Sequence, residues 1–260
     1  MNRADFTFVA TQAALAAGEL LRRGFGTSYE IFHKPGQHNL VTTFDKKAEE
    51  LIISFIHTHF PKHAILAEES GASQQSSDVT WIIDPLDGTV NFAHNIPHFS
   101  VSIAAAIGKE VVSGVVFQPM TGELFVAEKG KGAYLNGKPI RTTSRTTLEE
   151  CLLATGFPYN VRANPEHCID QFVKLAKQGI PIRRLGSAAI DLSYVAAGRF
   201  DAFWEVQLHP WDVAAGQLLV EEAGGKVTHY DGLPRDLFGT RHILASNGPL
   251  HPTMVKQLCA

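Results

Sequence analysis

The 260-residue sequence has little of what marks a secreted or a membrane-spanning protein. It has only three cysteines, Cys151, Cys168 and Cys259, and no pair of them has zinc-ribbon or Cys-x-x-Cys spacing. An odd number of cysteines argues against a disulfide framework, so a reducing cytoplasm is the expected setting. No run approaches the 18 or so unbroken apolar residues of a membrane span, so we expect no contact with a membrane.

The sequence also lacks an excess of charge of one sign. Its 26 acidic residues barely outnumber its 23 basic ones, and this balance argues against a nucleic-acid binder, which carries an excess of basic residues. With 45% apolar residues the chain is too hydrophobic to be disordered. The N-terminus lacks the apolar core of a signal peptide because Glu19 interrupts it. Its apolar residues recur at helical spacing, which predicts an amphipathic first helix.

The order of the periodic segments predicts an α/β fold of layered helices and sheets. Helical patterns over residues 6–21 and 45–60 are followed by short strand patterns at 64–67 and 81–84. Four strand-like runs between residues 101 and 140 are separated by turns too short for a parallel crossover, so they predict an antiparallel meander. Strands then alternate with helices in the second half, which is typical of a mixed or parallel sheet.

We expect two lobes that form one compact catalytic unit. An N-terminal α+β lobe spans residues 1–145 and a C-terminal α/β lobe spans 146–260, and the boundary lies in the polar stretch 142–149. Further local expectations are a loop or hairpin over 29–43 broken by Pro35 and Gly36, a polar loop over 71–78, and helices over 165–178 and 213–223.

The segment DPLDGT at residues 84–89 combines two carboxylates, a proline and a glycine after an apolar run. A strand that ends in this way places Asp84 and Asp87 at the carboxyl edge of a sheet, where α/β proteins bind ligands. If a short helix begins near Thr89, the amides of Gly88 and Thr89 form an anion pocket beside the two acids. Acids repel an anion unless cations lie between them, so the segment predicts metal-bridged phosphate binding.

Two other interpretations of this segment exist. In one, the acids only cap a turn. In the other, DGT ends the Asp-x-Asp-Gly-Thr signature of aspartyl-phosphate phosphatases, in which the first aspartate is the nucleophile. That signature spaces its acids two residues apart at the first strand, whereas Asp84 and Asp87 are three apart and lie beyond residue 80. We therefore reject the aspartyl-phosphate family.

Further acids lie where predicted elements begin or end. Glu68 and Glu69 follow a strand pattern, an unusual pair for a buried edge unless one of them is neutralised. Asp212 begins a strongly apolar helix, where it suits either an N-cap or a partly buried ligand position. Asp45 lies at another helix start. These positions favour the metal-binding interpretation of residues 84–89.

Three blocks in this order resemble the inositol monophosphatase family: EES at 68–70, WIIDPLDGTVNF at 81–92 and WDVAAGQLLVEEAGG at 211–225. The resemblance covers nearly the whole chain, and the order and spacing of the blocks make it specific. It implies an αβαβα sandwich that is usually dimeric, and it implies inhibition by lithium.

The resemblance also implies roles for individual residues. The implied magnesium ligands are Glu68, Asp84, Asp87, Asp212 and the carbonyl of Leu86. The implied catalytic residues are Glu68 and Thr89, with Thr89 paired to Asp45 to orient the attacking water. The implied substrate contacts are the amides of Gly88 and Thr89 for the phosphate, and Gly186, Ser187, Ala188 and Glu205 for the alcohol.

The chemistry of these residues predicts the cofactor. Oxygen ligands without a nearby histidine or cysteine favour Mg²⁺, with Mn²⁺ as the alternative, and we expect two to three ions. Paired metals can clamp phosphoryl oxygens, activate a bound water and stabilise the leaving alkoxide. We predict that Glu68 holds this water with help from Thr89, that Asp84 bridges two metals, and that no phosphoenzyme forms.

The sequence therefore predicts a Mg²⁺-dependent phosphomonoesterase acting on inositol 1-phosphate or a similar polyol phosphate. Fructose 1,6-bisphosphate, 3′-phosphoadenosine nucleotides, histidinol phosphate and NADP are alternative substrates, because related phosphatases share the metal site. A regulatory binding protein that keeps the fold, for example a partner of transcription machinery, is an alternative of another class. The expected protein partner is a second copy in a homodimer. Arg183 and Arg184 could bind a second anionic group or line the subunit interface, and we favour the interface.

Overall fold

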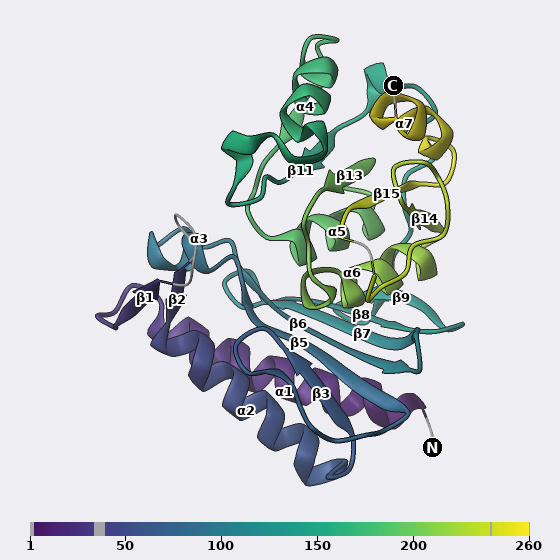
Figure 1. Cartoon of the computed structure of the whole chain (residues 1–260). Coiled ribbons are helices and arrows are strands. Elements are labelled where there is room, and N and C mark those ends of the chain that lie inside the picture. Colours follow the sequence, from purple (N-terminus) through teal and green to yellow (C-terminus); the bar gives the residue numbers. More distant parts are fainter. Residues whose placement is uncertain (1–2, 34–39, 240, 260) are drawn as a thin grey trace.

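Five layers stack in the order helices, sheet, helices, sheet, helices (Figure 1). The structure is a computed structural model that describes residues 3–33, 40–239 and 241–259. The helices of the three helical layers are, in order, α1 (Arg3–Gly24) with α2 (Thr43–His59), α5 (Ala188–Ala196) with α6 (Pro210–Glu222), and α4 (Cys168–Ala176) with α7 (His251–Leu258). The predicted αβαβα sandwich is confirmed.

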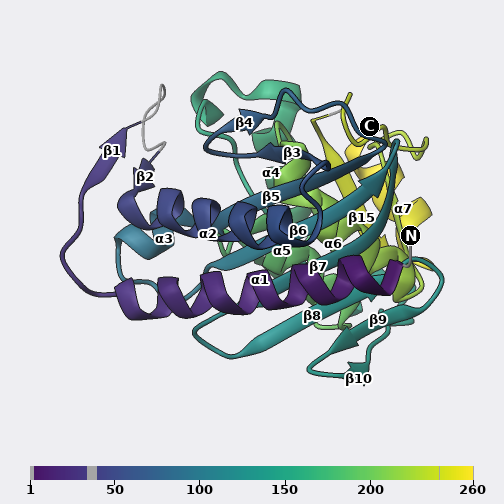
Figure 2. The same ribbon diagram turned by 90° about the horizontal axis from the view of Figure 1, so that it is seen from below.

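Helices α1 and α2 lie side by side across one face of the larger sheet (Figure 2). The amphipathic pattern expected of the first helix is confirmed, since Phe6, Val9 and Leu21 are almost fully buried. A Cβ at Gly18 would lie 2.4 Å from the ring of Phe117, so glycine lets α1 pack close to the sheet. Among the described residues, no helix combines the length and the apolarity that a bilayer crossing requires.

A small hairpin precedes α2. Strand β1 (Ile31–His33) pairs antiparallel with β2 (Leu40–Thr42), which confirms the hairpin expected over residues 29–43. Pro35 and Gly36, which were expected to break it, lie outside the described residues. The hairpin leads directly into the first turn of α2, where Asp45 lies.

The larger sheet has the strand order β10-β9-β8-β7-β6-β5-β3-β4. Its strands are β3 (Ala64–Ala67), β4 (Gly71–Ala72), β5 (Val79–Asp87), β6 (Ser100–Ile107), β7 (Glu110–Gln118), β8 (Glu123–Glu128), β9 (Gly132–Leu135) and β10 (Lys138–Pro139). Strands β6 to β10 form the predicted antiparallel meander, and β5 adds to it by pairing antiparallel with β6, while β3 pairs with β5 in parallel. The polar loop expected over 71–78 is wrong in part, because β4 pairs with β3 at its start.

Strand β5 extends beyond the apolar run from which it was predicted. It continues through Pro85 to Asp87, and its pairing with β6 is irregular between Asp84 and Asp87. Proline has no N–H for a regular ladder bond, which accounts for the irregularity at this point. Both acids of the motif therefore lie on the strand, and the turn begins only at Gly88.

The smaller sheet has the order β12-β11-β13-β15-β14. Its strands are β11 (Leu153–Thr155), β12 (Ile182–Arg183), β13 (Ala202–Glu205), β14 (Gly225–Thr228) and β15 (Ile243–Asn247). Strand β11 is parallel to β12 and β13, and β15 is antiparallel to β13 and β14, so the predicted mixed sheet is confirmed.

Two predicted helix boundaries are wrong. Helix α6 begins at Pro210 rather than at Val213, because proline suits the first turn, where its missing N–H costs nothing. The helix expected over 165–178 is divided into a 3₁₀ turn, η3 (Pro165–His167), and α4. Glu166 and His167 have φ angles of 50° and 59°, which interrupt a continuous helix. Two other 3₁₀ turns are η1 (Leu148–Glu150) and η2 (Val161–Ala163).

Candidate active site

The C-terminal ends of β3 and β5 bring the first two acids together. These parallel strands pair Ala67 with Ile83, so the residues that follow them lie at the same edge of the sheet. The amide of Glu68 donates to the carbonyl of Ile83 at 3.1 Å. Glu68 and Asp84, which come from separate sequence motifs, thus lie on adjacent strand ends.

Asp84 is buried with little compensation for its charge. The residue is 2% exposed, and its Oδ1 accepts a hydrogen bond from the amide of Leu86 at 3.0 Å. Burial, followed by the charges of Glu68, Asp87 and Asp212, raises the pKa of Asp84 well above its ordinary value. A carboxylate among three other acids is disfavoured as an anion unless a cation lies among them.

Asp87 joins the cluster from the end of β5. Its Oδ2 accepts hydrogen bonds from the hydroxyl of Ser187 and the amide of Ala189, both at 2.7 Å. Burial raises the pKa of Asp87 to about 6, although these two donors lower it. Asp87 therefore links the larger sheet to the start of α5 as well as belonging to the acid cluster.

Asp212 joins the cluster from the inner helical layer. It is the third residue of α6, not the N-cap that the sequence also allowed, and its Oδ2 accepts from the amide of His209 at 2.6 Å. Burial and then the charges of Glu68 and Asp87 raise the pKa of Asp212. Glu68 and Asp212 therefore interact although they lie more than 140 positions apart in the sequence.

The chemistry of this donor set fits a hard divalent cation. Carboxylates and a carbonyl oxygen are the ligands that Mg²⁺ and Mn²⁺ prefer. Among the residues that the structure describes, no group of three or more His, Cys, Asp or Glu side chains is positioned to hold a metal ion.

A hydrogen-bonded pair, Asp45 and Thr89, lies beside the cluster. The Thr89 hydroxyl is 2.9 Å from Asp45 Oδ1 and 3.0 Å from the carbonyl oxygen of Leu86. The other oxygen, Asp45 Oδ2, accepts from the amide and hydroxyl of Thr42 in a capping box at the start of α2. Asp45 is 0% exposed, and burial raises its pKa to about 7 against the effect of these donors.

Gly88 makes the turn between β5 and a short helix, α3 (Thr89–Ala93). Its φ of 99° is a conformation that side chains rarely adopt, and a Cβ would lie 3.1 Å from the carbonyl of His98 and 3.2 Å from that of Gly186. The helix expected near Thr89 is confirmed. The first amides of a helix have no partner within it, so those at Gly88 and Thr89 suit an oxyanion.

The segment 186–188 faces the cluster from the second half of the chain. Ser187 caps α5, because its Oγ accepts from the amide of Ile190 at 3.3 Å while its hydroxyl donates to Asp87. Gly186 has a φ of 92°, and a Cβ there would lie 3.1 Å from Asn91 Nδ2. Ala188 is 7% exposed at the first turn of α5. The predicted alcohol contacts are therefore held against the predicted metal ligands.

Glu205 is the last residue of β13, and it lies close enough to Asp87 for the charge of Asp87 to affect its pKa. Burial raises its pKa to about 8, although the nearby charge of Arg184 lowers it. A Cβ at Gly156 would lie 2.0 Å from the Glu205 carboxyl group, so Gly156 provides the room for this side chain. Sequence reasoning missed Gly156, because a single glycine after a strand pattern has many explanations.

Glu49 is a second residue that sequence reasoning missed. It is 4% exposed, and its two carboxylate oxygens accept from the amides of Glu69 and Ser70, both at 2.8 Å. This clamp fixes the turn that presents Glu68. Glu49 lies one helical turn after Asp45, so the spacing places both on one face of α2. That spacing was the available signal, but a glutamate in an amphipathic helix is ordinarily exposed.

Asn91 and Asp191 were also missed. The amide nitrogen of Asn91 donates to the carbonyls of His98 and Leu185 at 2.7 and 2.8 Å, which supports the segment before Gly186. Asp191 is 1% exposed, and its Oδ1 has no hydrogen-bond partner among the described residues. Burial, followed by the charges of Glu205 and Asp87, raises the pKa of Asp191.

Comparisons with known proteins agree with this geometry. The sequence model of the inositol monophosphatase family matches residues 2–260. An inositol-1-monophosphatase of Caulobacter vibrioides is 42% identical over 253 residues, 96% of this chain and 99% of that one. The Nus factor SuhB of Escherichia coli K12 is 43% identical over 254 residues, 97% of this chain and 93% of that one.

Solved structures give the same result. The extragenic suppressor protein suhB of Bartonella henselae has a TM-score of 0.92 and 40% identity, covering 98% of each chain. The inositol monophosphatase of Anabaena (Nostoc) sp. PCC 7120 has a TM-score of 0.88 and 41% identity, covering 100% of this chain and 97% of that one. The chain belongs to the inositol monophosphatase family and is a phosphatase, a phosphoric monoester hydrolase.

Proposed function

We propose that this chain hydrolyses a small polyol phosphate, first of all inositol 1-phosphate, by direct attack of water in a Mg²⁺-dependent reaction. The observation that supports this most strongly is the acid cluster. Burial and mutual repulsion raise the pKa values of Asp84, Asp87 and Asp212. Acids with such perturbed pKa values are typical of functional sites, and neutralisation by cations would explain why they are gathered here.

The cofactor in this proposal is two to three Mg²⁺ ions, with Mn²⁺ as the alternative. The residues that would hold them are Glu68, Asp84, Asp87, Asp212 and the carbonyl of Leu86. Bound Mg²⁺ supplies charge for the phosphoryl oxygens and the leaving alkoxide, and lowers the pKa of water. The amides of Gly88 and Thr89 would hold the phosphate at the start of α3.

Protein groups orient the attacking water. The Thr89 hydroxyl shares its one proton between Asp45 and the Leu86 carbonyl, so its oxygen can accept a hydrogen bond from the water. Asp45, with a pKa of about 7, can take up a proton near neutral pH. Glu68, on the adjacent strand end, would orient the same water. The proposed reaction forms no covalent phosphoenzyme.

The alcohol side of the site favours a polyol. Gly186, Ser187 and Ala188 would line it, with Glu205 across from them. With a pKa of about 8, Glu205 is largely protonated at neutral pH, so its carboxyl can both donate and accept hydrogen bonds. Hydroxyl groups match this behaviour better than the second phosphate of a bisphosphate does.

The test is phosphate release from a panel of monoesters, with and without Mg²⁺ and Li⁺. The panel includes inositol 1-phosphate, fructose 1,6-bisphosphate, a 3′-phosphoadenosine nucleotide, histidinol phosphate and NADP. We expect the highest kcat/KM for inositol 1-phosphate, loss of activity in EDTA and in Asp84→Asn, and inhibition by Li⁺. Activity that survives EDTA would exclude the metal mechanism, and a phosphoenzyme trapped by rapid quench would exclude direct attack by water.

A regulatory protein partner is the second candidate, because relatives 43% identical to this chain bear the name Nus factor SuhB. Affinity capture with the wild-type chain and with Asp84→Asn separates the two functions. A regulatory role predicts that the same partner is captured by both. Capture that requires catalytic turnover would argue against it.

We further propose a cytoplasmic homodimer in which the two lobes, residues 1–145 and 146–260, form one catalytic unit. Arg183 and Arg184 are exposed and would lie at the dimer interface. Light scattering should give twice the 28.4 kDa chain mass for the wild type and the monomer mass for Arg183→Glu. A monomeric wild type would contradict the dimer.

A further inference from the structure

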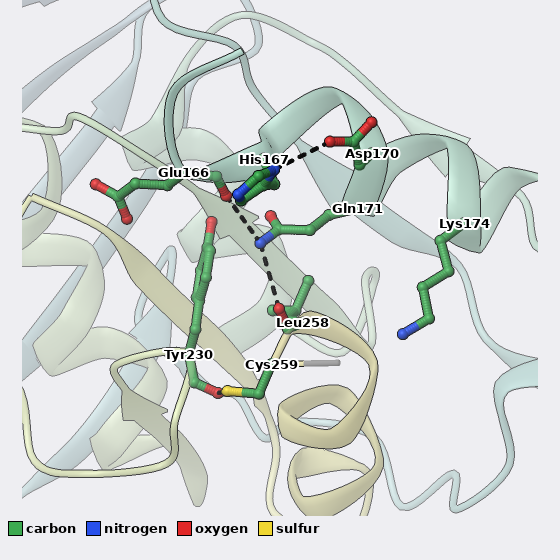
Figure 3. Close-up of a pocket in the computed structure, with 8 residues that line it drawn as sticks. All are labelled: Glu166, His167, Asp170, Gln171, Lys174, Tyr230, Leu258 and Cys259. Carbon is green, nitrogen blue, oxygen red and sulfur yellow. Dashed lines mark hydrogen bonds and ion pairs between the residues drawn. The ribbon is translucent and has the colours of Figure 1, made fainter.

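A cavity of about 590 Å³ lies between α4 and α7 in the outer helical layer (Figure 3). Its walls come from η3, α4, α7 and the residues that follow β14. None of the proposed catalytic, metal or substrate residues lines it. Its volume is typical of small-molecule sites and far exceeds the space that one bridging water occupies.

Two residues that line this cavity each have a buried polar atom without a hydrogen-bond partner among the described residues. The two atoms are the hydroxyl of Tyr230, a residue 7% exposed, and Oε1 of Gln171, a residue 8% exposed. The Gln171 nitrogen donates to the carbonyls of Glu166 and Leu258 at 3.2 and 3.3 Å, which fixes the orientation of the amide. Figure 3 shows both oxygens among the residues that line the cavity. Buried polar groups are ordinarily paired, so these two atoms indicate a ligand.

The protein holds Tyr230 in position without using its hydroxyl. The thiol of Cys259 donates to the Tyr230 carbonyl at 2.9 Å, and the Tyr230 ring packs against His242 with centroids 4.8 Å apart. His242 Nδ1 lies 2.7 Å from a carboxylate oxygen of Glu166, whose side chain points away from the cavity. The hydroxyl is therefore presented on a fixed ring.

The rim of the cavity is a strained turn. Asn164, Glu166 and His167 have φ angles of 47°, 50° and 59°, in the left-handed region that non-glycine residues rarely adopt. Such residues persist only where the surroundings hold them, and they gather at binding sites. Here the hydrogen bond from the Gln171 amide to the carbonyl of Glu166 holds η3 against α4.

The chemistry of the walls selects the class of ligand. Gln171 Oε1 requires a donor, which excludes a pure acceptor such as sulfate. The Tyr230 hydrogen requires an acceptor, which excludes a simple ammonium ion. Neutral hydroxyl groups satisfy both atoms, and the Tyr230 ring and Leu258 offer apolar surface to a carbon skeleton. We propose that this cavity is a second binding site, for a neutral small-molecule polyol.

The test is methyl NMR of the full-length protein during titration with myo-inositol and with glycerol, and with sulfate as the anionic probe that has no donor. The Leu258 methyls report the cavity, and the Leu86 methyls report the catalytic site separately. We expect a saturable shift at Leu258 with at least one of the two polyols and none with sulfate. No saturable Leu258 shift with either polyol means that the cavity holds only water, and overturns the proposal.

Tyr230→Phe removes only the unpartnered hydroxyl. It should weaken polyol binding at Leu258 at least tenfold and leave the Leu86 shifts and the phosphatase activity unchanged. The matched control is Tyr134→Phe, because the Tyr134 hydroxyl bonds to the carbonyl of Lys131 away from the cavity. Gln171→Met is a second variant with the same expected loss. Equal polyol affinity in the wild type and in either cavity variant would contradict the proposed site, whatever the catalytic activity proves to be.

Discussion

Asp84 and Asp201 are two almost fully buried aspartates that the molecule treats in opposite ways. Asp201 is 0% exposed, and it accepts hydrogen bonds from the Thr143 hydroxyl, the Leu152 amide and the Arg145 guanidinium. Asp84 is 2% exposed, accepts a hydrogen bond from the amide of Leu86, and is surrounded by three other acids. Burial alone therefore does not distinguish a structural acid from a functional one.

The difference lies in what surrounds each carboxylate. Donors and a cationic side chain make Asp201 a fixed link between the segment 143–152 and the start of β13. The acids around Asp84 disfavour its ionised form, and in the proposed site a bound cation would compensate that charge. The protein itself supplies the groups that compensate the charge of Asp201, whereas we propose that a cation compensates the charge of Asp84.

Replacing each aspartate by asparagine gives the largest expected contrast. Asp84→Asn should lower kcat/KM by more than about 100-fold, because even removing a group that only supports a metal ligand costs about 10–100-fold. The same change should raise the melting temperature of the metal-free protein, since it removes repulsion. Initial rates and thermal melts in EDTA measure both effects.

Asp201→Asn is the matched control. It should lower the free energy of unfolding by about 1–3 kcal/mol, because buried donors lose their acceptor, while kcat/KM stays within about threefold. Arg145 is half exposed, so water compensates part of the loss. A catalytic defect in Asp201→Asn as large as that of Asp84→Asn would contradict the proposal that only Asp84 belongs to the catalytic site.

The buried acids of the candidate site should also make the stability of the protein depend on pH. Burial raises the pKa of Asp45 to about 7 and of Asp87 to about 6, from an ordinary value of 3.8. The folded state thus binds these protons more tightly than the unfolded chain. Their contribution to stability is complete below the ordinary pKa and is lost as the pH rises through the raised values.

We therefore expect the melting temperature in EDTA to fall between about pH 5 and about pH 7.5. Asp45→Asn should make the fall shallower, and saturating Mg²⁺ should reduce it because cations favour the ionised acids. Asp201→Asn should keep the wild-type slope. A metal-free melting temperature that is flat over this range, or an unchanged slope in Asp45→Asn, would contradict the assignment.

Two glutamates offer a smaller, matched test. Glu49 accepts from the amides of Glu69 and Ser70, and Glu222 accepts in the same way from the amides of Gly130 and Gly132 at 2.9 Å each. Glu49→Ala should weaken Mg²⁺ affinity about 10-fold, because the turn that presents Glu68 loses its clamp. Calorimetric titration with Mg²⁺ measures the change.

Glu222→Ala removes an equivalent clamp from a turn outside the site. It should leave the Mg²⁺ affinity unchanged, and Glu49→Gln should restore part of what Glu49→Ala loses. Equal Mg²⁺ affinities in Glu49→Ala and Glu222→Ala would show that Glu49 supports the fold and not the site.

The smallest expected effect is at Ser187. Ser187→Ala removes the N-cap of α5 and the hydroxyl bond to Asp87, which should cost about 1 kcal/mol of stability and raise KM more than it lowers kcat. Ser187→Thr keeps the hydroxyl and should behave like the wild type. Steady-state kinetics with both variants decide this. A KM unchanged in Ser187→Ala would remove this residue from the alcohol side.

Local patterns were sufficient for much of the fold. The short turns between residues 101 and 140 left an antiparallel meander as the only pairing, and the structure has it. We missed that α6 begins at Pro210 and that Glu166 and His167 interrupt a predicted helix. Both features depend on backbone conformation, which the spacing of apolar residues does not reveal. The extension of β5 past Pro85 was missed for the same reason.

The site was only partly readable from the sequence. The motif at residues 84–89 indicated its acids, and the parallel pairing of β3 with β5 explains why Glu68 joins them. The motif marks Asp84, but nothing local marks Asp201 as a structural acid, since Asp201 also lies beside apolar strand residues. The donors of Asp201 come from residues 143–152, about 50 positions away, and only the folded chain reveals them.

The most direct test of the central claim is thermal unfolding with and without Mg²⁺ for the wild type, Asp84→Asn and Asp201→Asn. Mg²⁺ at about 100 times its Kd stabilises a folded site by about 2.7 kcal/mol, so the wild type should melt several degrees higher. Asp201→Asn should rise by the same amount from a lower start, and Asp84→Asn should not rise. A wild-type melting temperature that does not change with Mg²⁺, or an equal rise in Asp84→Asn, would contradict the proposed metal site.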